Sequence, residues 1–306
     1  MNILFAGSPK SASRILKYLV GVDDTNIKGV LTKPDKRGKR GNELLHCEVA
    51  KVANGHNLKL LKPISLNDKG FRDDVASLDI DFLIVAAYGK LLPEWLLRLP
   101  KIMPVNVHFS LLPLYRGASP IQSSLINGDD QTGVSFMQMT SGLDEGPIIL
   151  SKSMKINKDD NKVLLEERLT DLAIENILKV LVSLKEGLMN PIEQDHSQAS
   201  YCNKILKAES LTDFKDSATN IINKFKAYFE WPGLSFIFKE NRIKIHEISI
   251  VNEKSSGAAG SFNRIDSSGI YFNTYDYIIV ITYLQFPNKN IISSLDAFNS
   301  YQSFFE

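Results

Sequence analysis

Cysteine is scarce in this sequence. Cys47 and Cys202 are the only two among 306 residues, they lie far apart, and neither belongs to a Cys-x-x-Cys pair. A disulfide framework and a cysteine-bound zinc site are therefore both unexpected. Because this usage is typical of a reducing compartment, we expect a cytoplasmic protein.

Long apolar runs and a strong net charge are also missing. No apolar stretch approaches the roughly 20 residues that span a bilayer, and Met1–Phe5 is typical of a first strand rather than of a signal peptide. We therefore expect no association with a membrane. Lys and Arg number 36 against 35 Asp and Glu. Overall charge thus neither favours nor excludes a nucleic-acid partner, and local charge has to decide.

Two common site signatures are absent as well. The turn Gly7-Ser8-Pro9 lacks the glycine spacing of a dinucleotide-binding turn, so NAD binding is not expected. No metal-ligand spacing is present at His46, His56, His196 or His246. The sequence therefore predicts neither a bound dinucleotide nor a metal centre.

Strands and helices alternate over residues 2–188. Residues 81–86 form a continuous apolar run, which is typical of a strand buried on both faces of a parallel sheet. Further strands are predicted at 2–6, 27–32, 58–61, 104–108, 132–139 and 148–156, and helices at 11–22, 43–53, 121–127 and 162–188. This alternation predicts an α/β fold with a doubly wound, mostly parallel Rossmann-like sheet in a first domain, residues 1–188.

The pattern changes in the last third of the chain. Residues 189–206 are polar and weakly periodic, which indicates a linker. A helix is predicted at 214–229, followed by short strands at 234–238, 242–250, 260–265, 269–272 and 277–284. Short strands separated by turn residues predict a small OB-like β-barrel domain at 207–306.

Two polar residues stand together at the end of one predicted strand. Asn106 and His108 are separated by one residue, and alternate residues of a strand point to the same side. Open α/β sheets bind ligands at the carboxyl ends of their strands. The pair therefore indicates a ligand site, although capping of the strand end explains each residue at least as well when it is taken alone.

A third candidate, Asp144, lies in the glycine-flanked turn Gly142-Leu143-Asp144-Glu145-Gly146. Taken alone, such a turn is more often a hairpin with solvated acids. The combination of the three favours chemistry. Acyl transfer to an amine needs a donor for the developing oxyanion, a group that receives the amine proton and a group that orients it. An amide, an imidazole and a carboxylate supply these roles without a metal.

Connected motifs surround these residues. They are Asn106-Val107-His108, Ser110-Leu111-Leu112-Pro113, Tyr115-Arg116-Gly117-Ala118-Ser119-Pro120-Ile121-Gln122 and Gly142-Leu143-Asp144-Glu145-Gly146. In these motifs the sequence resembles the 10-formyltetrahydrofolate-dependent formyltransferases. The stretch Gly133-Val134-Ser135-Phe136-Met137-Gln138-Met139 resembles their tRNA-acting branch. Phe5–Pro9 and Trp231–Gly233 extend the resemblance to both ends of the chain.

The resemblance implies a role for each of the three residues. Asn106 would hydrogen-bond the formyl oxygen and the oxyanion formed from it, and losing such a donor typically costs on the order of 3 kcal/mol in the transition state. His108 would stabilise the tetrahedral intermediate and help to move protons. Asp144 would orient His108 and favour proton loss from the attacking amine. The domain at 1–188 would then be the catalytic one.

The resemblance also implies the substrates. The formyl donor would be 10-formyltetrahydrofolate, with no metal. Its site would be lined by the loop residues Ser110, Leu111, Leu112 and Pro113, and the pterin would face the backbone of Ala87, Tyr88 and Gly89. The acceptor would be charged initiator tRNA, for translation initiation, and the protein is expected to be a monomer.

Local charge gives the tRNA hypothesis uneven support. The loop 33–41 holds five basic residues and one acid, as phosphate contact requires. By resemblance the loop would enter the acceptor stem, with contacts from Lys36, Arg37, Lys39 and Arg40. Residues 207–306 hold 10 basic and 11 acidic residues, a net charge of −1. Binding there needs a local cluster, for which the candidates are Lys226, Arg242 and Lys244.

Other readings remain open. Related enzymes formylate glycinamide ribonucleotide or a nucleotide-linked amino sugar, or hydrolyse the formyl-folate. A non-catalytic tRNA- or folate-binding protein is a further alternative, against which the joint presence of Asn106, His108 and Asp144 argues.

Overall fold

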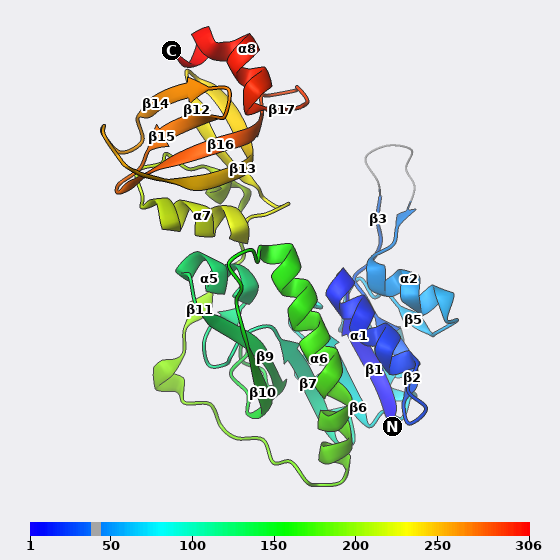
Figure 1. Ribbon diagram of the computed structural model, residues 1–306. Coiled ribbons are helices and arrows are strands. Elements are labelled where there is room, and N and C mark those ends of the chain that lie inside the picture. Colours follow the sequence, from blue (N-terminus) through cyan, green and yellow to red (C-terminus); the bar gives the residue numbers. More distant parts are fainter. Residues whose placement is uncertain (38–43) are drawn as a thin grey trace. The chain divides into compact units, whose positions relative to one another are not determined.

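The computed structural model describes residues 1–37 and 44–306 (Figure 1). The chain divides into two compact units. Unit 1 comprises Met1–Pro120, Gln131–Lys155 and Glu166–Cys202, and unit 2 comprises Ile121–Asp130, Ile156–Leu165 and Asn203–Glu306. Lys39 and Arg40, two of the predicted tRNA contacts, lie outside the described residues.

Unit 1 is built on a seven-stranded sheet with the order β10-β9-β7-β6-β1-β2-β5. The strands are β1 (Asn2–Gly7), β2 (Asn26–Leu31), β5 (Leu60–Leu61), β6 (Phe82–Ala86), β7 (Met103–His108), β9 (Gln131–Gln138) and β10 (Ile148–Lys155). Neighbours from β7 to β5 are parallel, and β9 is antiparallel to both β7 and β10. All five residues of β6 are buried. The predicted doubly wound, mostly parallel sheet is confirmed.

Helices alternate with these strands along the first 185 residues. They are α1 (Lys10–Val20), α2 (Glu48–Gly55), α3 (Lys69–Ala76), α4 (Glu94–Leu97), α5 (Pro120–Asn127) and α6 (Lys162–Lys185). The sequence did not predict α3 or α4. The helix predicted at 43–53 is wrong in its first part, because β4 (Leu44–Leu45) pairs with β3 (Lys36–Arg37) and α2 begins only at Glu48.

The segment after α6 contacts unit 1 through its backbone. Ile192 forms an antiparallel bridge with Ile148. After the short 3-10 helix η1 (His196–Gln198), β11 (Tyr201–Cys202) runs parallel to β8 (Arg116–Gly117). Much of the stretch predicted as a linker is therefore part of unit 1 as far as Cys202. The division into 1–188, 189–206 and 207–306 stays a prediction.

Unit 2 contains an antiparallel sheet with the order β12-β13-β16-β15-β14, and β17 pairs with β16. The strands are β12 (Leu234–Phe238), β13 (Asn241–Lys254), β14 (Phe262–Asp266), β15 (Gly269–Asn273), β16 (Tyr277–Gln285) and β17 (Ile291–Ser293). The rings of Phe238 on β12 and Phe262 on β14 lie 5.8 Å apart. The sheet thus curls so that its edges meet through side chains, as in the predicted barrel, although the described backbone pairs do not join β12 to β14.

Helix ends in unit 2 are set by caps. The helix predicted at 214–229 is shorter, α7 (Ala218–Ala227), because Ser217 Oγ accepts from the N–H of Asn220 at 3.2 Å. Phe214 lies before it with φ of 59° and is buried. Helix α8 (Ser294–Phe305), which the sequence did not predict, begins at the capping box of Ser293 and Asp296 and buries Phe305.

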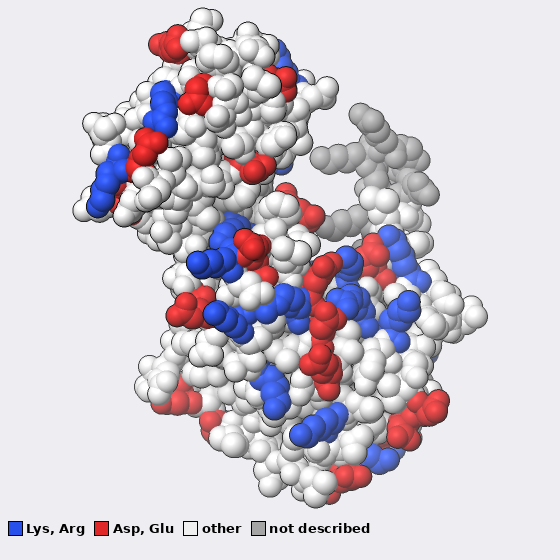
Figure 2. Space-filling view, viewed as in Figure 1, with Lys and Arg blue, Asp and Glu red and all other residues white. Residues whose placement is uncertain are grey.

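Charge is mixed over the surface in view. Figure 2 shows basic and acidic side chains interspersed on this face, without a large area of one sign. This agrees with the near-zero net charge of the chain. Among the described residues, no helix is both long enough and apolar enough to cross a membrane.

Candidate active site

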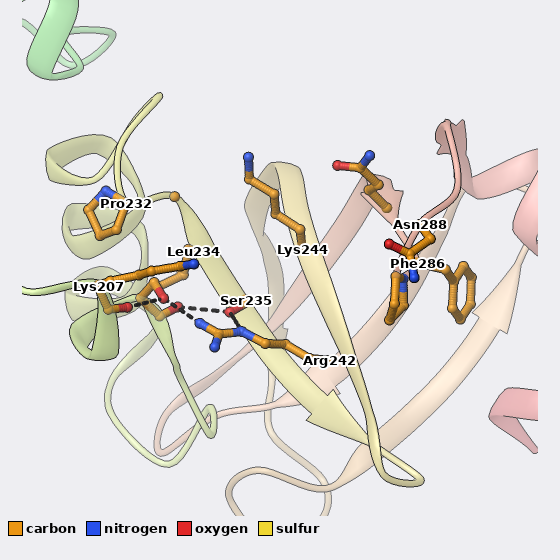
Figure 3. A pocket seen from close by; sticks show the side chains of 12 residues that line it. Lys207, Pro232, Leu234, Ser235, Arg242, Lys244, Phe286 and Asn288 are labelled. Atoms are coloured by element: carbon orange, nitrogen blue, oxygen red, sulfur yellow. Dashed lines mark hydrogen bonds between the residues drawn. The ribbon is translucent and has the colours of Figure 1, made fainter. Parts of the chain in front are cut away.

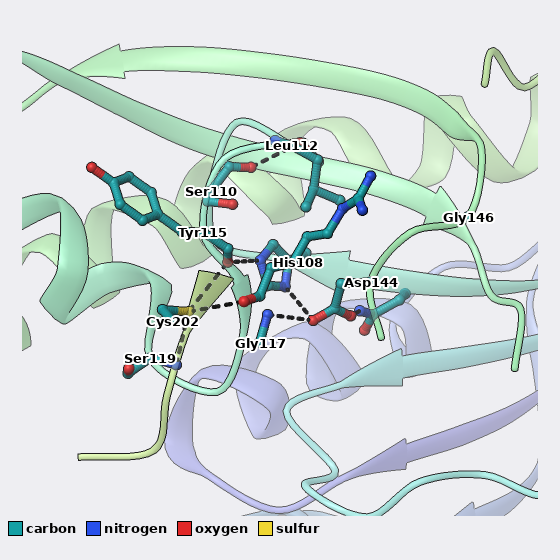
Figure 4. A network of polar contacts seen from close by, with 12 residues as sticks. His108, Ser110, Leu112, Tyr115, Gly117, Ser119, Asp144, Gly146 and Cys202 are labelled. Atoms are coloured by element: carbon teal, nitrogen blue, oxygen red, sulfur yellow. Dashed lines mark hydrogen bonds and ion pairs between the residues drawn. The ribbon is translucent and has the colours of Figure 1, made fainter. Parts of the chain in front are cut away.

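The three residues predicted to react meet at the carboxyl end of β7. Asn106 and His108 are 9% and 6% exposed, on a strand held between β6 and β9. Asn106 Nδ2 donates to Asp144 Oδ1 at 3.1 Å. His108 Nδ1 lies 3.6 Å from Asp144 Oδ2. The structure therefore brings the amide, the imidazole and the carboxylate together. Figure 4 shows His108 beside Asp144.

The imidazole of His108 faces an oxygen on each side. Its Nε2 lies 2.9 Å from the carbonyl oxygen of Tyr115. Because a carbonyl can only accept, Nε2 carries a hydrogen in this contact. Nδ1 is the nitrogen that faces Asp144. The arrangement can hold a proton between Nδ1 and the carboxylate, which suits a group that receives and passes on protons.

Asp144 sits in a turn of unusual conformation. Its φ is 50°, a region that residues other than glycine rarely adopt. A Cβ added at Gly146 would lie 2.0 Å from the carbonyl oxygen of Gln138, so the turn needs glycine there. Asp144 Oδ2 also accepts from the N–H of Gly117 at 2.9 Å. The turn thus directs the carboxylate toward Asn106 and His108.

The loop that follows β7 is fixed by serine side chains. Ser110 Oγ donates to the carbonyl of Leu114 at 2.6 Å. Ser135 Oγ, on β9, donates to the carbonyl of Ser110 at 2.8 Å, and it accepts from the N–H of Leu112 at 3.0 Å. Ser135 was not predicted as a site residue. A serine within the apolar strand 133–137 was the only signal available in the sequence.

The residues predicted to bind folate differ in how far they are exposed. The side chains of Ser110 and Leu112 are buried, and those of Leu111 and Pro113 are partly buried. In the turn after β6, Ala87 and Gly89 are exposed and have φ of 47° and 67°. This turn can therefore offer backbone groups to a ligand, and its contact with the pterin stays a prediction.

Tyr88 anchors the same turn. Its side chain is 1% exposed within the core, and its hydroxyl has no hydrogen-bond partner among the described residues. Burial raises the pKa of the Tyr88 phenol to about 12. The side chain of Tyr88 is thus turned into the protein, and the exposed residues of the turn are Ala87 and Gly89.

Some of the residues that directly follow this turn in the sequence line a groove that the sequence did not predict. It has a volume of about 380 Å³. Two large apolar side chains at its edge, Ile64 and Leu91, are 91% and 78% exposed. The groove is lined by Ile64, Ser65, Leu66, Asn67, Lys90, Leu91, Leu92 and Pro93. Apolar walls with a few polar groups are typical of small-molecule sites.

Comparison with known proteins identifies the family. A family model described as formyl transferase matches residues 1–181, and one described as formyl transferase, C-terminal domain, matches residues 204–302. The chain belongs to the formyl transferase family. The methionyl-tRNA formyltransferase of Thermotoga maritima is 37% identical over 98% of this chain and 95% of its own length. That of a Sulfurihydrogenibium species is 34% identical over 99% and 97%.

Solved structures of other proteins share the fold. The sugar 3N-formyl transferase WlaRD has a TM-score of 0.67 at 19% identity, covering 95% of this chain and 99% of that one. An N-formyltransferase of Helicobacter canadensis has 0.65 at 18%, covering 93% and 99%. HypX of Aquifex aeolicus has 0.64 at 14% over 99% of this chain, which spans about half (49%) of HypX. At these identities the likeness shows the fold alone.

The predicted tRNA residues of unit 2 separate into two places. Arg242 and Lys244, on β13, line a cavity of about 390 Å³ together with Lys207 (Figure 3). Arg242 Nε donates to Ser235 Oγ at 2.9 Å. Lys226 lies on α7, does not line this cavity, and donates to the carbonyl of Lys158 at 2.5 Å. Of the three, only Arg242 and Lys244 are brought together.

Hydrogen bonds fix the base of the predicted basic loop in this member of the family. Asp35 Oδ1 and Oδ2 accept from Lys62 Nζ at 2.8 and 2.6 Å, and Oδ2 lies 2.9 Å from His46 Nδ1. Burial of the Asp35 carboxyl acts to raise its pKa, but the hydrogen bonds from Lys62 and His46 outweigh burial and lower the pKa below its ordinary 3.8. Within the described part of the chain, no group of three or more His, Cys, Asp or Glu side chains could hold a metal ion.

The Asp35 contacts predict a dependence of stability on pH. Because the folded state lowers the pKa of Asp35, its contribution is fully present above the unfolded value near 3.8 and is lost as the pH falls through the lowered folded value. We expect Asp35→Asn to reduce the free energy of unfolding by about 1–2 kcal/mol at pH 7, with the difference shrinking in acid. Denaturant titration across this range measures it. Asp74→Asn, which loses only an exposed pair with Lys59, is the control. A difference that stayed constant with pH would contradict the assignment.

Proposed function

We propose that this protein transfers the formyl group of 10-formyltetrahydrofolate to the amino group of methionine on charged initiator tRNA. The observation that carries the reaction is the meeting of Asn106, His108 and Asp144 at the carboxyl end of β7. The acceptor is supported by relatives named methionyl-tRNA formyltransferases that match nearly the whole chain. A monomer acting in the cytoplasm, where initiator tRNA is used, completes the proposal.

Asn106 is the hydrogen-bond donor in this scheme. A primary amide nitrogen carries two hydrogens, and one described bond, to Asp144 Oδ1, uses one of them. The second is directed to the formyl oxygen, where negative charge develops as the amine attacks. Because Asn106 is buried, it is held in place before the reaction begins and loses little free energy in reorganising.

His108 and Asp144 handle the proton that the attacking amine must lose. His108 receives it, directly or through water, on Nδ1, because Nε2 already carries a hydrogen. The bond between the formyl carbon and the folate nitrogen then breaks, and the leaving nitrogen takes up a proton. Asp144 lies beside Nδ1 and stabilises the ring while it is charged. The Tyr115 carbonyl and the Gly117 N–H hold the ring and the carboxylate in this relation.

Folate would be held at the turn 87–89 and the loop 110–113, and it supplies the formyl group when bound. Exposed backbone at Ala87 and Gly89 suits the hydrogen-bonding edge of a pterin. The apolar side chains of Ile64 and Leu91 suit its aromatic parts. The N-formyltransferase of Helicobacter canadensis was solved with folinic acid, and HypX with tetrahydrofolic acid.

The tRNA backbone would contact basic residues on both units. On unit 1 these would be Lys36, Arg37, Lys39 and Arg40 of the loop. On unit 2, Arg242 and Lys244 offer two positive charges at one cavity. Lys226 would contribute separately, from α7.

An acceptor assay tests the proposal. The protein is incubated with 10-formyltetrahydrofolate and, in separate reactions, charged initiator tRNA, charged elongator tRNA and a nucleotide-linked amino sugar. We expect formylation of charged initiator tRNA, because its methionine supplies the amine. The reaction without protein is the control. Formylation of the sugar amine alone would contradict the tRNA acceptor while leaving the reaction class in place.

Substitutions in the site test the roles of its residues. We expect Asn106→Ala to lower kcat about 10²- to 10³-fold through loss of the oxyanion donor. His108→Ala and Asp144→Ala should each lower kcat about 10²-fold or more through loss of proton transfer. Folate affinity, measured by equilibrium binding, should change little. Ser153→Ala, exposed on β10, is the matched control. Near-normal turnover in any site variant would remove that residue from the scheme.

Salt dependence tests the basic residues of unit 2. Each phosphate contact releases bound counterions, so Arg242→Ala and Lys244→Ala should each weaken tRNA binding and reduce the slope of log affinity against log salt by about one. Lys226→Ala tests in the same way whether Lys226, which lies apart from this pair, contacts tRNA. Lys254→Ala, at the far end of β13, is the control. If affinity and salt slope stayed at the wild-type values in all three variants, unit 2 would not contact tRNA through these residues.

A further inference from the structure

Gln194 is a buried side chain that binds the turn of Asp144. It is 4% exposed. Its Nε2 donates to the carbonyl oxygens of Asp144 and Gly146 at 2.9 and 2.7 Å. Since the amide nitrogen carries two hydrogens, both are used on this turn. Gln194 therefore fixes the backbone on each side of Glu145.

The turn depends on such outside support. Asp144 has φ of 50°, and strained backbone of this kind persists only where the surroundings hold it. The carboxylate contacts of Asp144 act at the end of its side chain. Gln194 acts instead on the backbone from which that side chain projects. It therefore controls where the carboxylate lies.

Arg116 holds the other end of Gln194. Its Nε and Nη2 donate to Gln194 Oε1 at 3.0 and 2.8 Å. Arg116 is 1% exposed, and its side chain also contacts the Tyr201 hydroxyl at 3.3 Å and His196 Nδ1 at 3.2 Å. The Gln194 oxygen thus accepts two hydrogen bonds from one buried guanidinium. Such bonds polarise the amide and strengthen its N–H donors.

The backbone around Arg116 contacts the reactive side chains directly. The Tyr115 carbonyl lies against His108 Nε2, and the Gly117 N–H donates to Asp144 Oδ2. The side chain of Arg116, the residue between these two, donates to Gln194, and Gln194 donates to the backbone carbonyl of Asp144. The contacts form a closed ring around the proposed site.

We propose that Gln194 is a positioning residue for formyl transfer, with Arg116 as its anchor. The pair sets the distance and direction of the Asp144 carboxylate relative to His108 and Asn106. This inference rests on the proposed role of Asp144 in the reaction. Neither side chain needs to touch a substrate for the effect.

Gln194→Met, which keeps the side-chain length and removes its polar atoms, tests the proposal. We expect kcat to fall about 10- to 100-fold, as is common for groups that orient reactive residues. KM for 10-formyltetrahydrofolate and for charged initiator tRNA should change less than about threefold. The control is Gln198→Met, the same change four residues along on an exposed side chain bound to Asp195. An unchanged kcat in Gln194→Met would overturn the proposal.

A double-mutant cycle separates positioning from general destabilisation. If Gln194 acts through Asp144, adding Gln194→Met to Asp144→Ala should lower kcat no further. Full additivity of the two losses would overturn the proposal. Should Gln194→Met fail to fold, Gln194→Glu keeps an acceptor for Arg116 while removing both donors, and the same drop in kcat is expected. Wild-type kcat in Gln194→Glu would also overturn the proposal.

The same measurements distinguish this inference from the proposed function. Near-normal turnover in Asp144→Ala would contradict the role of Asp144 and with it the proposed mechanism. Loss of turnover in Asp144→Ala together with wild-type kcat in Gln194→Met would contradict the positioning role alone.

Discussion

The carboxylate of Asp144 is the charge around which the site of unit 1 is arranged. Taking an ionised carboxylate out of water is costly unless hydrogen bonds replace its hydration, and the side chain of Asp144 is only 15% exposed. Its donors are the amide of Asn106 and the N–H of Gly117, which lie 38 and 27 residues away in sequence. The site therefore exists only when strand, loop and turn have all folded.

This dependence explains which parts of the site could be predicted from the sequence. Asn106, His108 and Asp144 could be, because strand alternation and a glycine turn are local signals and the motifs join them. Ser135 and Gln194 could not be. Their side chains form hydrogen bonds with segments that are distant in sequence. Arg116 and Gln194, for example, are 78 positions apart, and such contacts leave no periodic pattern in the sequence.

The same reasoning applies to the fold. Buried strands such as β6 could be predicted, because a run of apolar residues carries its own signal. The first residue of a helix could not be predicted where a single cap or a strand pairing determines it. Ser217 starts α7 four residues later than predicted, and the pairing of Leu44–Leu45 with β3 delays α2. Amphipathic spacing continues through such positions, whereas caps and pairing end it.

The pairing of β11 with β8 has a consequence for how such chains can be recombined. Gln194 and Tyr201 follow α6, yet they contact the residues that surround His108 and Asp144. A chimera of two relatives joined directly after Lys185 would combine a site from one parent with its supporting segment from the other. A junction after Cys202, where unit 1 ends, keeps both from the same parent. The segment that must come from one parent to keep the site intact thus extends past α6.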